Sequence, residues 1–326
     1  MIDKCMEMAS FYDISVNKAI RGRGAVVLDT DKGPKKMSEY SGTESRLKFE
    51  LELLNFIKEK GFENVDNIVK TKDGQLMAKD EFETAYILKD WYLGKDCNAR
   101  VEADVVKGVE MLAVLHNITE SVETLRESSF SCESPLEEYE RHNAELKRVK
   151  NYIRSKKKKV EFEYDILRHF DEYYSYAVEA TVSLQKSNIH RLLKDAFDKV
   201  SICHGNYNYH NIIFLGSNCA VTDFERSGKG LLVKDLYFYL RKVMEKHNWD
   251  LKIGYNILDR YNKIRPMSQE ENQILRIMLM YPEKFWKVVN QYYNSNKSWI
   301  PDKNVEKLRA VYEGQLKKEE FIKKMW

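Results

Sequence analysis

The side chains best suited to chemistry lie in one polar stretch between residues 200 and 225. It contains the histidines and asparagines His204, Asn206, Asn208, His210 and Asn211, followed by Asp223. Polar groups between apolar strands are costly to bury unless they find partners, and a metal ion bound to phosphate is a common partner. Mg²⁺ prefers oxygen ligands such as a carboxylate together with an amide or water. Asn211 and Asp223 face each other across a hairpin that turns at Gly216-Ser217-Asn218, so they are the candidate pair.

The elements that position these residues differ along the chain. Residues 10 to 90 read as strands with one helix, because apolar runs such as Ala25–Leu28 are separated by turn residues such as Asp73-Gly74. The segment from Thr43 to Lys60 repeats leucine and isoleucine at three- and four-residue steps and is followed by Gly61, which predicts a helix. The predicted order is strand, strand, helix, strands.

From about residue 100 the sequence becomes helical. Only five prolines and fourteen glycines occur in the whole chain, so few breaks are expected. Residues 136 to 193 predict two or more long charged helices, with the run Lys156–Lys159 between them, either a solvated helix end or a docking patch. The helical pattern resumes after the polar stretch, from Leu231 onward.

Composition limits the possible classes of protein. The 326 residues are 43% hydrophobic and 32% charged, which is typical of a globular chain, and the net charge of +3 gives no support to nucleic-acid binding. No apolar stretch approaches the roughly 20 residues that span a bilayer, and the N-terminus has no apolar signal core. Five cysteines without CxxC spacing do not indicate a zinc site or a disulfide scaffold, so we expect synthesis in a reducing cytoplasm.

The motif HGNYNYHNIIF followed by VTDFE resembles the HGDxxxxN…D signature of the aminoglycoside phosphotransferase and choline kinase superfamily, whose members are similar in fold to protein kinases. More narrowly, strings such as CHGNYNYHNIIF, VTDFERS, DLYFYLRKVMEKHNWD and YPEKFWKVVNQYYNSNKSWIP resemble the CotS family of spore coat proteins. The resemblance covers nearly the whole chain. It implies an α+β, protein-kinase-like fold, with a small N-lobe (1–88) of antiparallel sheet and helix and a large, mainly helical C-lobe (89–326).

The resemblance also implies site residues for ATP and Mg²⁺. Gly22 and Gly24 match the loop that covers the phosphates, Glu50 the helix glutamate that pairs with the phosphate-binding lysine, and Leu88 to Trp91 the hinge that receives adenine. Asn211 and Asp223 match the metal-binding positions, and His204 is expected to organise the loop. The plainer interpretations are a hairpin turn for the two glycines, a solvent-facing charge for Glu50, an interlobe linker for Leu88 to Trp91, and structural capping for Asn211 and Asp223.

Two departures from the family pattern stand out. The general base of the family is the aspartate of HGD, and here Asn206 occupies that position, where an amide cannot accept the substrate proton. The strand lysine that binds the phosphates is replaced by Ser38. Lys36 lies two residues earlier on the same face and is the candidate substitute, with Lys35 a weaker one.

Three functional hypotheses follow. The first is a spore coat component whose kinase fold is degenerate, a pseudokinase that binds other coat proteins, with the aromatic string from Tyr281 to Trp299 either an interface or part of the core. The second is an active ATP- and Mg²⁺-dependent phosphotransferase acting on a small hydroxylated or amine substrate. The third is a switch that binds ATP without chemistry. Location in the spore coat is implied by the resemblance alone, and no nucleic-acid or membrane partner is expected.

Overall fold

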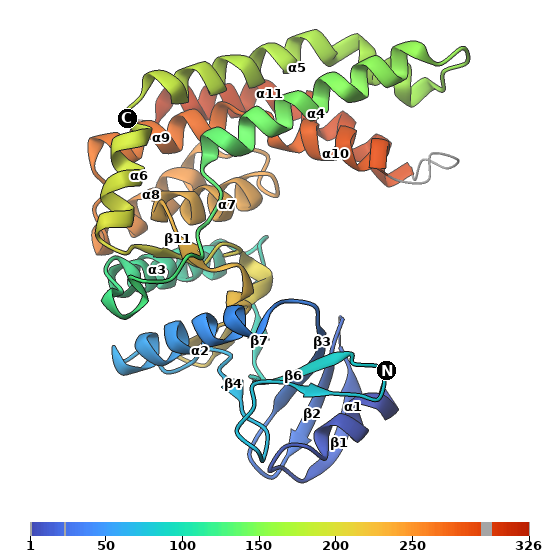
Figure 1. The fold of residues 1–326 in the computed structure, drawn as a ribbon. Helices are drawn as coiled ribbons and strands as arrows, with labels where there is room; N and C mark the ends of the chain where they lie inside the picture. The colour runs from blue at the N-terminus through green and yellow to red at the C-terminus, as the bar shows by residue number, and fades with distance from the viewer. Residues whose placement is uncertain (1, 23, 295–301, 326) are drawn as a thin grey trace. The chain divides into compact units, whose positions relative to one another are not determined.

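The chain divides into two compact units, each described separately below. The computed structural model describes residues 2–22, 24–294 and 302–325, with side chains not described at 302 and 303 (Figure 1). The first unit comprises residues 1–132 and 197–235, and the second comprises 133–196 and 236–326. The lobe boundary at residue 88 stays a prediction.

The first unit is built on an antiparallel sheet in the order β1-β2-β3-β6-β4, with β5 also paired to β6. Its strands and the two helices beside it are α1 (Ile2–Ala9), β1 (Val16–Arg21), β2 (Val26–Thr30), β3 (Lys35–Tyr40), α2 (Glu44–Glu59), β4 (Ile68–Val69), β5 (Ala78–Lys79) and β6 (Ala85–Asp90). The side chain of Thr43 caps α2 by accepting a hydrogen bond from the backbone of Arg46. The predicted helix lies between strands, as expected, but three strands rather than two precede it, and α1 was not predicted.

Alternation along the strands gives this sheet two covered faces. Met37 and Leu88 pack with Met8 of α1 in one apolar cluster. Ile87, one residue before Leu88, packs with Leu47 of α2 in another. In the β3–β6 register, Lys36 lies opposite Lys89 and Ser38 opposite Ile87. These four side chains therefore share the face that α2 covers.

The rest of the first unit carries the polar stretch. A short strand β7 (Lys95–Asp96) pairs with the hairpin β9 (Ile212–Leu215) and β10 (Asn218–Val221), and β8 (Ile202–Cys203) pairs with β11 (Gly228–Lys229). Helix α3 (Glu102–Thr119) and three short 3-10 turns complete this part, at Glu123–Leu125, Tyr209–Asn211 and Phe224–Arg226. The hairpin turn falls at residues 216–217, as predicted.

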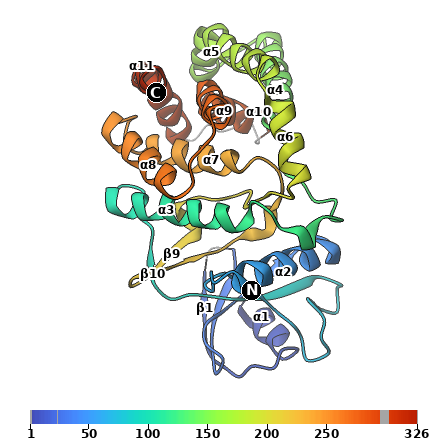
Figure 2. The same cartoon turned by 90° about the vertical axis from the view of Figure 1, so that its left-hand side faces the viewer.

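The second unit is helical. Figure 2 looks nearly along the axes of α4, α5, α9, α10 and α11, which pack side by side. Its helices are α4 (Pro135–Ser155), α5 (Glu161–Lys186), α6 (Ile189–Asp198), α7 (Leu232–Met244), α8 (Leu251–Ile264), α9 (Gln269–Met280), α10 (Glu283–Asn294) and α11 (Asp302–Lys324), with α6 and α7 crossing the unit boundaries. None of the described helices is long and apolar enough to cross a membrane.

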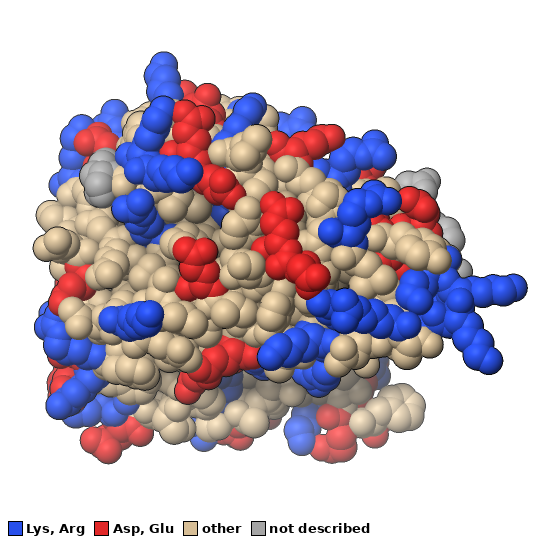
Figure 3. Space-filling view, turned by 90° about the horizontal axis from the view of Figure 1, so that it is seen from above, with Lys and Arg blue, Asp and Glu red and all other residues tan. Residues whose placement is uncertain are grey.

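Two open questions from the sequence are answered in this unit. Tyr281, Phe285 and Tyr292 are buried, so the described part of the aromatic string belongs to the core, while Trp299 lies outside the described residues. Lys157 and Lys158 are exposed at the turn between α4 and α5. Figure 3 shows this face of the unit with acidic and basic side chains intermixed, and basic ones gather at the edge where the α4–α5 turn lies. The run is a solvated turn, which does not by itself indicate a docking patch.

Candidate active site

The loop between β8 and β9 is anchored by a buried carboxylate. Asp235, in the first turn of α7, accepts hydrogen bonds from the backbone N–H groups of His204 (2.6 Å) and Gly205 (2.9 Å). Nε2 of His116, on α3, lies 3.4 Å from the same carboxylate. These bonds hold the pKa of Asp235 below its usual value although the group is buried. Asp235 thus anchors the start of the loop.

His204 makes contacts within the loop. Its Nε2 lies 3.1 Å from the carbonyl oxygen of Thr222, and its Nδ1 accepts a hydrogen bond from the backbone N–H of Asn206 at 3.2 Å. With Nδ1 accepting, Nε2 carries the proton and donates to Thr222. The imidazole therefore ties the start of the loop to the end of β10, an arrangement that suits a structural role.

The three predicted residues of the metal and base positions converge. The amide nitrogen of Asn206 donates to Oδ2 of Asp223 at 2.5 Å, and that of Asn211 donates to the same oxygen at 3.1 Å. Asp223 has the left-handed backbone angles φ 72° and ψ 55°. A non-glycine residue in that region carries strain, which a fold retains where the position of the side chain matters.

The donor set at this point fits a hard cation. Asp223 supplies carboxylate oxygen atoms, and the amides of Asn206 and Asn211 supply oxygen atoms when they rotate by 180°, an orientation set only by the hydrogen-bond network. Mg²⁺ takes such ligands, with phosphate and water filling the remaining positions. The residues present are therefore compatible with a magnesium ion bound to a nucleotide.

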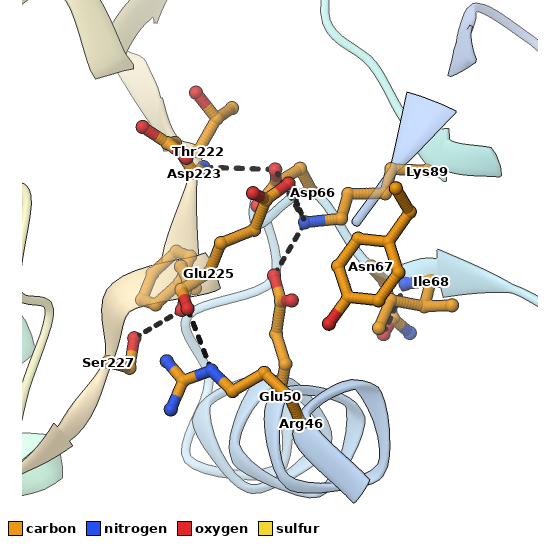
Figure 4. A network of polar contacts seen from close by, with 12 residues as sticks. Arg46, Glu50, Asp66, Asn67, Ile68, Lys89, Thr222, Asp223, Glu225 and Ser227 are labelled. Atoms are coloured by element: carbon orange, nitrogen blue, oxygen red, sulfur yellow. Dashed lines mark hydrogen bonds and ion pairs between the residues drawn. The ribbon is translucent and has the colours of Figure 1, made fainter. Parts of the chain in front are cut away.

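A second cluster is centred on a lysine that the sequence analysis did not single out (Figure 4). Nζ of Lys89, on β6, lies 2.6 Å from Glu50 of α2, 3.9 Å from Asp66 and 3.5 Å from Glu225. The side chains of Lys89, Glu50 and Asp66 are at most 3% exposed. Oδ2 of Asp66 also accepts the backbone N–H of Asp223 at 2.9 Å. This bond joins the lysine cluster to the metal position.

The lysine cluster contains more acidic than basic charge. Burial raises the pKa of Glu50 to about 7, with Lys89 opposing the shift, and burial also raises the pKa of Asp66. Burial disfavours the charged form of Lys89, but Asp66, Glu50 and Glu225 together raise its pKa above the ordinary value. One oxygen of Glu50 and one of Asp66 are buried with no hydrogen-bond partner among the described residues. Lys89 is consequently a firmly charged counter-ion.

In the structure, the lysine that pairs with Glu50 is therefore Lys89, on β6. The sequence analysis looked to Lys36 on β3 instead. Nζ of Lys36 lies 5.0 Å from the ring centre of Trp91, and Lys35 pairs with Asp90 at 2.7 Å. A lysine inside the apolar run AYILKDWYL was the signal available in the sequence, because a charged residue in a buried strand needs a partner. The assignment of Lys36 to a phosphate stays a prediction.

The remaining predicted nucleotide residues fall at three places in the first unit. Gly22 and Gly24 lie in the turn between β1 and β2, where Gly22 N–H bonds to the carbonyl of Ala25 and Gly24 has φ 68°. Arg23 lies outside the described residues. Leu88 is buried against α1, and the backbone of Trp91, just after β6, bonds to Pro34. Their roles toward a nucleotide stay predictions.

The fold belongs to a known class, the kinase-like fold of aminoglycoside phosphotransferases. The chain is similar to the crystal structure of an aminoglycoside phosphotransferase from Alicyclobacillus acidocaldarius, with a TM-score of 0.85 at 17% identity over 98% of this chain and 94% of that one. It is also similar to spectinomycin phosphotransferase APH(9)-Ia in complex with ADP and spectinomycin, with a TM-score of 0.68 at 12% identity over 96% and 94%. These similarities confirm the predicted α+β kinase-like fold.

Sequence comparison assigns the chain to a family. Residues 6–325 match the family described as "Spore coat putative kinase YutH", so the chain belongs to that family. Spore coat protein S of Bacillus subtilis (strain 168) is 21% identical over 330 residues, which cover 98% of this chain and 93% of the relative. The resemblance to spore coat proteins with a phosphotransferase-like fold is thereby confirmed.

Proposed function

We propose that this protein is a spore-coat-associated pseudokinase, a kinase-like fold that has lost efficient phosphoryl transfer. The observation that carries the proposal is the amide of Asn206, which donates a hydrogen bond to Asp223 from the position of the general base. An amide cannot take the proton of a substrate hydroxyl, and general-base help contributes about 10²–10⁴-fold to such reactions. The hydrogen bond also ties Asn206 to the metal-binding carboxylate.

The lysine cluster supports the same conclusion. In the kinase-like site that the resemblance implies, the lysine paired with the helix glutamate also binds nucleotide phosphates. Lys89 is 3% exposed and surrounded by Glu50, Asp66 and Glu225. A phosphate approaching Lys89 would meet the charges of these carboxylates as well. Lys89 therefore serves as an internal counter-ion with little reach to a phosphate.

Nucleotide binding without turnover is the expected residual property. Asp223 and Asn211 keep an oxygen donor set for Mg²⁺, and the solved relatives include an AMP-bound spectinomycin phosphotransferase and an amicoumacin kinase with AMP-PNP and Ca²⁺. We infer that this chain binds Mg-ATP weakly and uses its surface to bind other coat proteins. Lobe closure driven by the nucleotide is how such a protein would act as a switch.

The test is thermal unfolding of the whole chain titrated with ATP and Mg²⁺, with EDTA in a parallel series. A ligand at 100 times its Kd adds about 2.7 kcal/mol of stability, which is easily measured. We expect a Mg²⁺-dependent rise that Asp223→Asn abolishes. ADP production should stay at background with sugars and amino alcohols as acceptors. Acceptor-dependent ADP production that Asp223→Asn removes would overturn the proposal.

A second candidate, an active phosphotransferase on a small hydroxylated or amine substrate, is favoured by one observation. Asp223 keeps its strained left-handed backbone and gathers Asn206 and Asn211 onto one oxygen. Phosphoryl transfer depends mainly on positioning and charge neutralisation, so loss of the base alone leaves a slow enzyme. Asn206→Asp distinguishes the two candidates. A rise of about 10²–10⁴-fold above a wild-type rate that is itself measurable would favour the transferase. Nucleotide binding with no rise would favour the pseudokinase.

A further inference from the structure

A cluster of potential metal ligands lies in the second unit, among residues that the proposed function does not use. Glu138 and His142 are four residues apart on α4, so they lie on one side of the helix. Glu283 opens α10. One ligand atom from each of the three lies within 4.8 Å of the other two. All three residues lie within the second unit.

Glu283 is an unusual residue in its surroundings. Its side chain is 7% exposed, and its Oε2 is buried with no hydrogen-bond partner among the described residues. That oxygen points at the imidazole of His142, with Oε2 and Nδ1 3.7 Å apart, beyond hydrogen-bond distance. A buried carboxylate oxygen left without a bond costs about 1–3 kcal/mol or more, so something is expected to bind there.

The spacing of these atoms suits a metal ion. Zinc forms bonds of about 2.0–2.2 Å to imidazole nitrogen and carboxylate oxygen, so two ligands at a tetrahedral angle lie about 3.4 Å apart. The 3.7 Å between Nδ1 of His142 and Oε2 of Glu283 is close to that value. Glu138 is partly exposed, so its side chain can complete the set with a small shift.

Neighbouring side chains hold the two helices in register around the cluster. The ring of Trp286 stacks on His142, with centroids 3.3 Å apart, and its indole N–H donates to Glu145 of α4 at 2.7 Å. The hydroxyl of Tyr281 donates to Asn143 at 2.9 Å. These contacts fix the plane of the imidazole and the start of α10.

One of the three residues borders a cavity. Glu283 lines a cavity of about 390 Å³ in the same unit, together with Arg241 and Lys318. Arg241 also bonds to Glu245 at 2.5 Å, so its charge is shared between the two carboxylates. The cavity leaves room for water beside Glu283.

We propose that Glu138, His142 and Glu283 bind a divalent transition-metal ion, with Zn²⁺ the best match to one imidazole and two carboxylates. Mg²⁺ is a poor match because it prefers oxygen ligands alone. The ion would join α4 to α10 and is independent of the nucleotide position in the first unit. The competing explanation is that Glu283 is protonated and neutral, so that no metal ion is needed to neutralise its charge.

The test is titration of the chelator-treated whole chain with Zn²⁺ by isothermal calorimetry. Variants are Glu283→Gln and His142→Gln, and the matched control is His190→Gln, an exposed histidine on α6. Asp223→Asn removes the carboxylate of the candidate magnesium position in the first unit, so it distinguishes an ion bound there from one bound at Glu283. Co²⁺ titration adds a spectroscopic readout, because an ion on His142 should quench the fluorescence of Trp286 stacked against it. The variant Trp286→Phe lacks this fluorophore and therefore shows whether the quenched emission comes from Trp286.

We expect one equivalent of Zn²⁺ on the wild type, His190→Gln and Asp223→Asn, and at least a tenfold loss of affinity in Glu283→Gln and His142→Gln. Glu283→Gln keeps the shape of the side chain and removes a buried charge, so it should fold, and circular dichroism checks this. Absence of Zn²⁺ and Co²⁺ binding by the wild type would overturn the proposal. So would affinity unchanged in the folded Glu283→Gln chain.

Discussion

Replacing Lys89 tests the reasoning about the lysine cluster most directly. Lys89→Met keeps the length of the side chain and removes its charge, leaving Glu50 and Asp66 buried beside Glu225. Each of the three carboxylates lies within 4 Å of the ammonium nitrogen, where a pair is worth about 4 kcal/mol at an effective dielectric constant near 20. The cost of desolvating buried ions offsets part of this attraction, and removing one partner of such a cluster typically costs about 3–5 kcal/mol.

The assay is urea unfolding at pH 8, followed by circular dichroism. We expect the free energy of unfolding of Lys89→Met to fall by about 3–5 kcal/mol. Adding Glu50→Gln to this variant should restore part of the loss, because one unpaired carboxylate is removed. The control is Lys95→Met. Its partner Asp104 lies 2.9 Å away, but the lysine side chain is 64% exposed, so about 0–1 kcal/mol is expected. Equal stability of Lys89→Met and wild type would refute the account of the cluster.

Two further predictions concern the first unit. In the wild type, the folded state holds the Glu50 proton up to about pH 7, whereas the unfolded state releases it near 4.5, so Glu50 lowers the free energy of unfolding by about 3 kcal/mol as the pH rises between these values. This contribution should be absent in Glu50→Gln. An unchanged pH profile in urea titrations would contradict the raised pKa of Glu50. Gly205→Ala should destabilise the chain by more than about 2 kcal/mol, since Gly205 has φ 77° and an added Cβ would lie 2.1 Å from the carbonyl oxygen of Arg226. Gly74→Ala, with φ 79° and open space, should cost only about 1 kcal/mol in the same unfolding assay.

Several features could be predicted from local sequence because local physics determines them. The helix from Glu44 to Glu59 follows from its apolar spacing and its threonine cap. The hairpin that brings Asn211 to Asp223 follows from two apolar runs around a short turn. Local pattern therefore predicted these elements, whereas the kinase-like fold was predicted from the resemblance of the HGNYNYHN and VTDFE motifs to a known superfamily.

The partner of Glu50 could not be predicted in this way. Glu50 and Lys89 are 39 residues apart, and their contact depends on the β3–β6 register and on the packing of α2 against that sheet face. The sequence analysis offered Lys36, on the same face as Ser38, and only the tertiary structure showed that Lys89 is the partner of Glu50. The choice depends on which ammonium group reaches the buried carboxylates.

The same division holds in the second unit. Its helical character and the four-residue spacing of Glu138 and His142 could be predicted from the sequence, because both depend only on residues that are near each other in the chain. The position of Glu283 beside His142, and the burial of Tyr281 and Phe285, depend on how α10 packs against α4. The sequence by itself determined the elements and the chemical groups available. The tertiary structure decided which of these groups meet, because contacts between distant residues depend on packing and strand register, which no local pattern encodes.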